Sequence, residues 1–313
     1  MFSLLKGVVM NLIETKDLCK RYGDNLVINH VDMHIPEKAI YGFVGENGSG
    51  KTTIMRLLTG LAEVTSGEFT MFGVSNKNRA IHATRKQVSA IVETPSLVPH
   101  LTAKQNMIYQ ELYEGITVSE KERDELLKKV HLETAGNKKV KNYSLGMRQR
   151  LAIALALLKK PKVMFLDEPM NGLDPEGIAE LRELLIDLNK KEGITVLISS
   201  HILSELEKIA TCYGFISHGK LLEEITTEEL QKRCKKSLNL VVNDISKAEK
   251  VLNTLKVKEF DTLPNGSVKI YDDKLKIADV VIAFNKAGLD ILSINSNEGS
   301  VEDYYLNLVK GVN

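Results

Sequence analysis

The 313-residue sequence has few cysteines, almost no net charge and no long apolar run, and each of these absences excludes a class of protein. Its three cysteines, Cys19, Cys212 and Cys234, show no CxxC spacing, so we expect no disulfide framework and a reducing, cytoplasmic setting. Lys+Arg of 42 against Asp+Glu of 41 leaves a formal charge of +1, so the chain as a whole is not expected to attract nucleic acid. The longest apolar run, residues 151–158, is far shorter than the roughly 20 residues that a spanning helix needs.

The length of the chain allows two hydrophobic cores, because a single core usually stops growing near about 250 to 300 residues. The first ten residues, MFSLLKGVVM, contain one lysine and too short an apolar stretch for a secretory signal. We expect them to be a leader or an upstream start, with Met10 as the alternative start.

The pattern of residues 11–222 predicts one α/β domain. Residues 12–35 alternate in the strand period around a turn at Gly23-Asp24-Asn25, which indicates an antiparallel pair. Continuous apolar runs such as AIYGFV, KVMFL and TVLISS then alternate with helical stretches, which is typical of a mainly parallel sheet buried on both faces. The charge-rich, helix-forming residues from about 96 to 160 interrupt this rhythm and predict an inserted helical subdomain.

The sequence pattern changes after Lys220, and residues 223–313 are predicted to form a second, smaller domain. Strand and helix patterns follow one another in the order βαββαβ, with a last helix after them. That order is compatible with a ferredoxin-like α+β domain. It contains no recognisable catalytic constellation.

The segment GENGSGKT, Gly45–Thr52, matches the phosphate-binding pattern GxxxxGK[ST] between an apolar run and an amphipathic helix. Glycines allow successive backbone N–H groups to surround phosphates, and the helix N-terminus adds a partial positive charge. Lys51 supplies a full positive charge and the Thr52 hydroxyl can ligate magnesium. The sequence therefore predicts a nucleotide-phosphate site here.

Three further polar residues follow buried strands. In VMFLDEP, Asp167 and Glu168 end a strand, and side-chain alternation would direct Asp167 to the metal and Glu168 to an attacking water. His201 ends the run TVLISS, and ligands of open α/β sheets gather outside the carboxyl ends of the strands. We expect its imidazole to hydrogen-bond a γ-phosphate oxygen.

Two helix starts add candidate anion contacts. Ser144 in YSLGM is placed as an N-cap, and Gly146 keeps the backbone accessible. Asp174-Pro175 in NGLDP forms a cap and first-turn pair for the following helix. Taken alone, both patterns are also typical of ordinary capped helices.

Taken together, these elements resemble the nucleotide-binding subunit of an ATP-binding cassette (ABC) transporter over about residues 12–222, a P-loop NTPase fold with an antiparallel β subdomain. The resemblance implies that Tyr22 stacks on adenine, that Glu168 is the general base, that NGLD with Asp174 is the D-loop and that His201 is the switch histidine. Ser144 and Gly146 correspond to the signature motif. It also implies a Walker A loop that binds ATP with Mg²⁺, formed by Gly45, Glu46, Asn47, Gly48, Ser49, Gly50, Lys51, Thr52 and Thr53.

The resemblance further implies partners. In this family the signature helix of one subunit closes over ATP held by another, so we expect a head-to-tail dimer of two copies. Integral-membrane permease subunits on separate chains would receive the motion through the segment after Glu93, and the chain would lie peripherally on the inner face of the cell membrane. No nucleic acid is expected.

Glu93 departs from the family pattern, because the family usually has the Q-loop glutamine there. A glutamate keeps the acceptor role toward magnesium, loses the amide donor and adds a negative charge beside the phosphates. With SLGM in the signature and a C-terminal extension of roughly 90 residues, the chain resembles ATPases of bacitracin and lantibiotic self-protection exporters.

Several alternatives stay open on the sequence. In one, Glu93 is a neutral variation and the chain is a general drug or lipid efflux ATPase. In another, the chain is a soluble cassette ATPase of DNA repair or translation. The C-terminal domain is either a small-ligand sensor or a domain that steadies the dimer.

Overall fold

The computed structural model describes residues 10–92, 96–234, 237–255, 257, 259–262, 266–271, 277–297 and 299–310. The chain divides into two compact units, Met1–Thr227 and Glu228–Asn313. The boundary falls later than the predicted residue 222, because strand β10 (Lys220–Thr226) pairs along its length with β9 (Cys212–Ser217) of the first unit. No helix in these ranges is long and apolar enough to cross a membrane.

The first unit begins with an antiparallel sheet in the order β2-β1-β4-β5. Its strands are β1 (Asn11–Tyr22), β2 (Asn25–Pro36), β4 (Ser66–Met71) and β5 (Val74–Ser75). β1 and β2 pair as predicted, with Thr15 opposite Met33 and Leu18 opposite Val31. The alternation in the sequence therefore marks one face of this pair that is buried in the core.

The second sheet of this unit has the order β10-β9-β3-β8-β7-β6, and all neighbours except β9 and β10 are parallel. Every residue of β3, β7, β8 and β9 is buried, which confirms that the continuous apolar runs are central strands. The remaining elements of this sheet and its helices are β3 (Ile40–Val44), α1 (Lys51–Thr59), α2 (Ile81–Thr84), η1 (Arg85–Gln87), β6 (Val88–Ile91), β7 (Val163–Asp167), α6 (Pro175–Glu192), β8 (Thr195–Ser200) and α7 (Leu203–Leu206).

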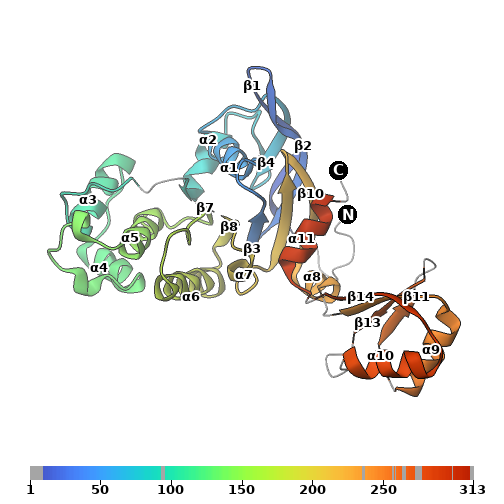
Figure 1. Ribbon diagram of the computed structural model, residues 1–313. Coiled ribbons are helices and arrows are strands. Elements are labelled where there is room, and N and C mark those ends of the chain that lie inside the picture. The colour runs from blue at the N-terminus through green and yellow to red at the C-terminus, as the bar shows by residue number, and fades with distance from the viewer. Residues whose placement is uncertain are drawn as a thin grey trace. The chain divides into compact units, whose positions relative to one another are not determined.

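The predicted helical insertion forms a cluster of its own at the left of Figure 1. It contains α3 (Ala103–Glu114), α4 (Glu120–Lys129), η2 (Glu133–Ala135), η3 (Val140–Asn142) and α5 (Leu145–Leu157). Thr102 and Ser119 begin α3 and α4 with complete capping boxes, each paired with a Glu or Gln three residues later. The buried Glu111 accepts two hydrogen bonds from Arg123, which joins α3 to α4.

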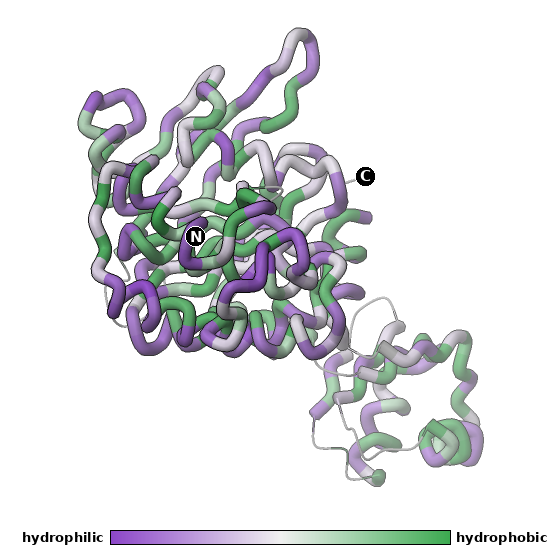
Figure 2. The backbone as a smooth tube through the Cα atoms, turned by 90° about the vertical axis from the view of Figure 1, so that its left-hand side faces the viewer, coloured by the Kyte–Doolittle hydropathy of each residue, from purple (hydrophilic) through white to green (hydrophobic). Residues whose placement is uncertain are grey.

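The second unit is a four-stranded antiparallel sheet with two helices packed into its core. The sheet order β12-β13-β11-β14 and the succession βαββαβ are those of the predicted ferredoxin-like domain. Figure 2 shows hydrophobic and hydrophilic stretches alternating along both units. The unit comprises α8 (Thr227–Arg233, which begins at the boundary), β11 (Ser237–Val242), α9 (Ile245–Thr254), β12 (Phe260–Thr262), β13 (Ser267–Ile270), α10 (Ile277–Lys286), β14 (Ile291–Asn297) and α11 (Val301–Lys310).

Candidate active site

The loop between β3 and α1 has two positions that favour glycine, Gly50 for its backbone conformation and Gly45 for lack of space. Gly50 has φ of 114°, and a Cβ there would lie 2.6 Å from Ile28 Cδ1. A Cβ at Gly45 would lie 2.5 Å from the carbonyl oxygen of Ile216. Among the described residues, no side chain caps the N-terminus of α1. The free backbone N–H groups of this helix end are therefore available to an anion.

Lys51 lies inside this loop with only 6% of its surface exposed. Its Nζ donates hydrogen bonds to the carbonyl oxygens of Gly45 at 2.6 Å and Glu46 at 3.0 Å. It also lies 3.7 Å from Glu168 Oε1. Burial lowers the pKa of Lys51, and the negative charges of Glu168 and Asp167 oppose that shift. A bound phosphate would supply the counter-charge that this buried ammonium otherwise takes from Glu168 and Asp167.

Asp167 ends β7 and is held by hydroxyl groups on both oxygens. Thr52 Oγ1 donates to Oδ2 at 2.6 Å and Ser199 Oγ donates to Oδ1 at 2.6 Å. Thr52 is on α1 and Ser199 on β8, so three elements meet at one carboxylate. An oxygen pair of this kind, a carboxylate beside a hydroxyl, suits Mg²⁺, which prefers oxygen ligands.

Glu168 follows the last residue of β7 and has a left-handed backbone with φ of 48°. Its backbone N–H donates to Ser199 Oγ at 2.9 Å. Its Oε2 lies 2.7 Å from His201 Nδ1, and Oε1 is buried without a hydrogen-bond partner in the described part of the chain. The expectation that strand alternation alone directs Glu168 is therefore incomplete, because this residue lies beyond the strand and its own backbone turn directs the side chain.

The residues present fit a triphosphate with its metal. Two buried oxygens have no hydrogen-bond partner among the residues that the structure describes: Ser49 Oγ on the loop and Glu168 Oε1 beside it. Within the described ranges no group of three His, Cys, Asp or Glu side chains could hold a metal. Mg²⁺ in nucleotide sites is usually held by one or two carboxylates together with substrate phosphates, and Asp167 beside Thr52 offers one such carboxylate.

The remaining predicted residues lie at other element ends. Tyr22 ends β1 as an exposed ring, with Lys20 Nζ 4.6 Å from its centre. Ser144 caps α5 and its exposed hydroxyl accepts from Met147 N at 3.2 Å. Asp174 caps α6 and accepts from Gly177 N at 3.0 Å.

The starts of α5 and α6 lie close together. A Cβ placed on Gly146 would be 3.9 Å from Leu173 Cδ2, and one on Gly172 would be 3.1 Å from Leu145 Cδ2. Asn47, Gly48 and Glu46 are exposed on the phosphate loop, and Thr53 is half-buried in the first turn of α1. Glu93 lies outside the described residues, so the prediction for it stays a prediction.

Sequence reasoning missed Ser199, which binds both Asp167 and the backbone of Glu168. The available signal was its position near the carboxyl end of a buried strand, where the polar residues of the site gather.

A family model described as ABC transporter matches residues 28–171. The bacitracin transport ATP-binding protein BcrA of Enterococcus faecalis is 40% identical, covering 96% of this chain and 97% of that protein. The lantibiotic transport ATP-binding protein SrtF of Streptococcus pyogenes is 44% identical over 68% of this chain and 90% of its own length.

Solved structures agree with these relatives. An ATP-binding subunit of an ABC transporter is 28% identical with a TM-score of 0.61, covering 71% of this chain and 92% of that one. A bacterial ABC transporter cassette solved as a dimer is 25% identical with a TM-score of 0.62, covering 69% of this chain and 98% of that one. Because a relative is 40% identical over 96% of the chain, and Lys51, Asp167, Glu168 and His201 gather around one glycine loop, the chain belongs to the ABC transporter family, as a cassette that binds and hydrolyses ATP.

Proposed function

We propose that this chain is the ATP-hydrolysing subunit of an exporter that protects its cell against a peptide antibiotic such as bacitracin or a lantibiotic. The observation that carries the substrate class is the extent of the match to the bacitracin protein. It covers 96% of this chain and therefore includes both units, whereas the match to the lantibiotic protein covers 68%. The second unit thus favours bacitracin over a lantibiotic.

Within the site, each residue has a separate task. Lys51 and the N–H groups at the start of α1 would hold the β- and γ-phosphates, and Thr52 with Asp167 would hold Mg²⁺, which supplies charge neutralisation when bound. In the tautomer that carries its hydrogen on Nδ1, His201 donates to Glu168 Oε2. Oε1 is then left as the acceptor for the proton of the attacking water. Oε1 is also the oxygen that faces Lys51, at 3.7 Å.

The remaining candidates act across a dimer. We infer that two copies associate head to tail, as expected from the family, so that Ser144 and Gly146 of one copy face ATP bound by the other, with Asp174 beside them. Ser144 is exposed at a helix N-terminus, which is the geometry that receives an anion. Tyr22 keeps an exposed ring for stacking on adenine, with Lys20 over it.

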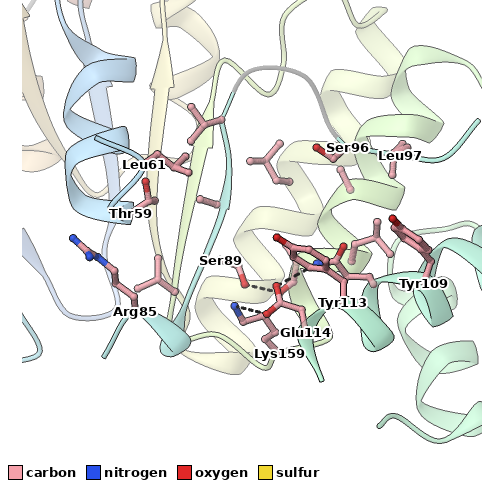
Figure 3. A pocket seen from close by; sticks show the side chains of 18 residues that line it. Thr59, Leu61, Arg85, Ser89, Ser96, Leu97, Tyr109, Tyr113, Glu114 and Lys159 are labelled. Atoms are coloured by element: carbon pink, nitrogen blue, oxygen red, sulfur yellow. Dashed lines mark hydrogen bonds and ion pairs between the residues drawn. The ribbon is translucent and has the colours of Figure 1, made fainter. Parts of the chain in front are cut away.

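A groove beside the helical subdomain supports the assignment of a membrane partner. It has a volume of about 630 Å³ and lies between the end of α1, β6 and the helices α3 and α5 (Figure 3). Tyr109 and Tyr113 on α3 line it and are exposed, and Lys159 pairs with Glu114 at 3.3 Å on its wall. Ser96, three residues after Glu93 in the sequence, also lines the groove. We infer that a segment of an integral-membrane permease binds here, which would hold the chain on the inner face of the membrane.

The test is resistance in a sensitive host that expresses this chain with its membrane subunits. We expect a raised inhibitory concentration for bacitracin, a smaller rise for a lantibiotic, and no rise with Glu168→Gln. Tyr113→Glu should keep the ATPase rate of the isolated protein and lose protection. A protein that stays in the soluble fraction with its partners present, or that protects against unrelated drugs equally, would refute the proposal in favour of a soluble cassette ATPase or a general efflux ATPase.

A further inference from the structure

The two edges of the sheet in the second unit are built differently. At one edge, β12 has three residues and carries Asp261, which accepts a hydrogen bond from Tyr271 at 2.9 Å. At the other edge, β14 has seven residues, Ile291–Asn297, with no charged residue and no proline. Proteins normally protect an edge strand by making it short or by placing charges or proline on it. Only β12 is protected in this way.

The side chains of β14 are open as well as its backbone. Residues 292–296 are all exposed, with Leu292 at 67% and Ile294 at 36%. Ile294 lies opposite the fully buried Leu240 of β11, so it belongs to the row of side chains that faces the core. Among the strands that the structure describes, β11 alone pairs with β14. As far as the described residues show, the strand therefore presents an edge without a second neighbouring strand, together with two exposed apolar side chains.

We propose that β14 pairs in antiparallel fashion with β14 of a second copy, about a two-fold axis at Ile294, and joins the two four-stranded sheets into one. A two-fold contact uses the same patch on both copies, and an uncharged strand can face itself without like-charge repulsion. In this register Ile294 faces its counterpart, and Ser293 lies opposite Asn295 of the second copy on both sides of the axis. The outward N–H and C=O groups then have partners.

This contact goes beyond the proposed function, because it gives the second unit a role that needs no nucleotide. The head-to-tail dimer of cassettes closes on ATP, whereas pairing of β14 persists when ATP is absent. It also makes ATP-driven closure a rearrangement within an existing dimer, which raises the effective concentration of one cassette for the other.

The test is sedimentation velocity of the full chain without nucleotide over the micromolar range. The wild-type protein should dimerise. Ser293→Lys/Asn295→Lys places like charges directly opposite one another twice, so its dissociation constant should rise about tenfold or more. Ser293→Lys/Asn295→Glu places opposite charges at the same positions and should dimerise like the wild type. The neutral exchange Ser293→Asn/Asn295→Ser is the composition control and should also remain a dimer.

All variants should keep the wild-type ATPase rate at saturating ATP and high protein concentration, which verifies folding. Hydrogen exchange of the wild-type β14 amides should slow as concentration rises. A monomeric wild type, equal dissociation constants for the two charged variants, or protection of β14 only by a membrane subunit would each overturn the proposal. Loss of antibiotic protection with an intact dimer would count against the proposed function alone, so the two failures are distinguishable.

Discussion

Replacement of Glu168 by glutamine tests the central chemical assignment of the site. Glutamine has nearly the same shape, so it preserves the packing beside His201 and Lys51 but removes both the negative charge and the ability to accept a proton. Oε1 is buried without a hydrogen-bond partner and lies 3.7 Å from Lys51 Nζ, while Oε2 is taken by His201 at 2.7 Å. Oε1 is therefore the one carboxylate oxygen left to accept a proton, and glutamine offers no carboxylate oxygen in its place.

The expected loss follows from that assignment. Removal of a general base costs about 10² to 10⁴ in rate, which corresponds to about 2.7 to 5.5 kcal/mol in the activation barrier. ATP binding should be retained, because Lys51, Thr52 and the loop N–H groups do not depend on the proton acceptor. In the nucleotide-free protein the variant should lower the pKa of Lys51 further, since Glu168 opposes the lowering caused by burial.

The assay is phosphate release at saturating ATP and magnesium, with nucleotide binding measured separately by titration calorimetry. Glu125→Gln is the matched control, because Glu125 is an exposed carboxylate on α4, 3.9 Å from Lys121, and should leave the rate unchanged. A Glu168→Gln variant that hydrolyses ATP at nearly the wild-type rate would show that another group accepts the proton.

Three shorter predictions follow from other residues. The hydrogen bond to Glu224 raises the pKa of His34. The stabilising effect of this hydrogen bond is therefore complete below the unfolded pKa of about 6.5 and fades as pH rises through the higher folded pKa. The loss of Tm caused by His34→Gln should be larger at about pH 6 than at about pH 9. Gly214→Ala would place a Cβ 2.0 Å from the buried Tyr41 hydroxyl, which donates to Glu224, and should cost about 1 to 3 kcal/mol in urea unfolding. Glu93→Ala should reduce magnesium-dependent hydrolysis more than Glu93→Gln, and equal, unimpaired rates would indicate a neutral position.

The architecture was predictable where hydrophobic pattern alone sets it. The runs around Met164 and Leu197 are continuous, and both lie in strands with every residue buried. The end of the first unit at Thr227 is not visible in the hydrophobic pattern, because β10 after Gly219 is half-buried and mixes Leu with Glu. Its membership of the first sheet depends on pairing with β9, a neighbour relation that composition does not show.

The location of the site was predictable for the same reason. Asp167 ends a buried strand, Lys51 and His201 come after two others, and neighbouring parallel strands end at one edge of the sheet. The directions of the side chains were not. Glu168 turns toward His201 because its φ is positive, and a positive φ at a residue other than glycine is rare enough that sequence patterns give no warning of it.

Ser199 explains how this unfavourable backbone is held. A left-handed conformation at a non-glycine residue costs about 1 to 3 kcal/mol and persists only where the surroundings fix it. One hydroxyl of β8 accepts from the backbone N–H of Glu168 at 2.9 Å and donates to Asp167 Oδ1 at 2.6 Å. The same oxygen thus fixes both the turn that directs the proton acceptor and the carboxylate assigned to the metal. Loss of Ser199 should therefore disturb hydrolysis and magnesium dependence together, although Ser199 itself need not contact ATP.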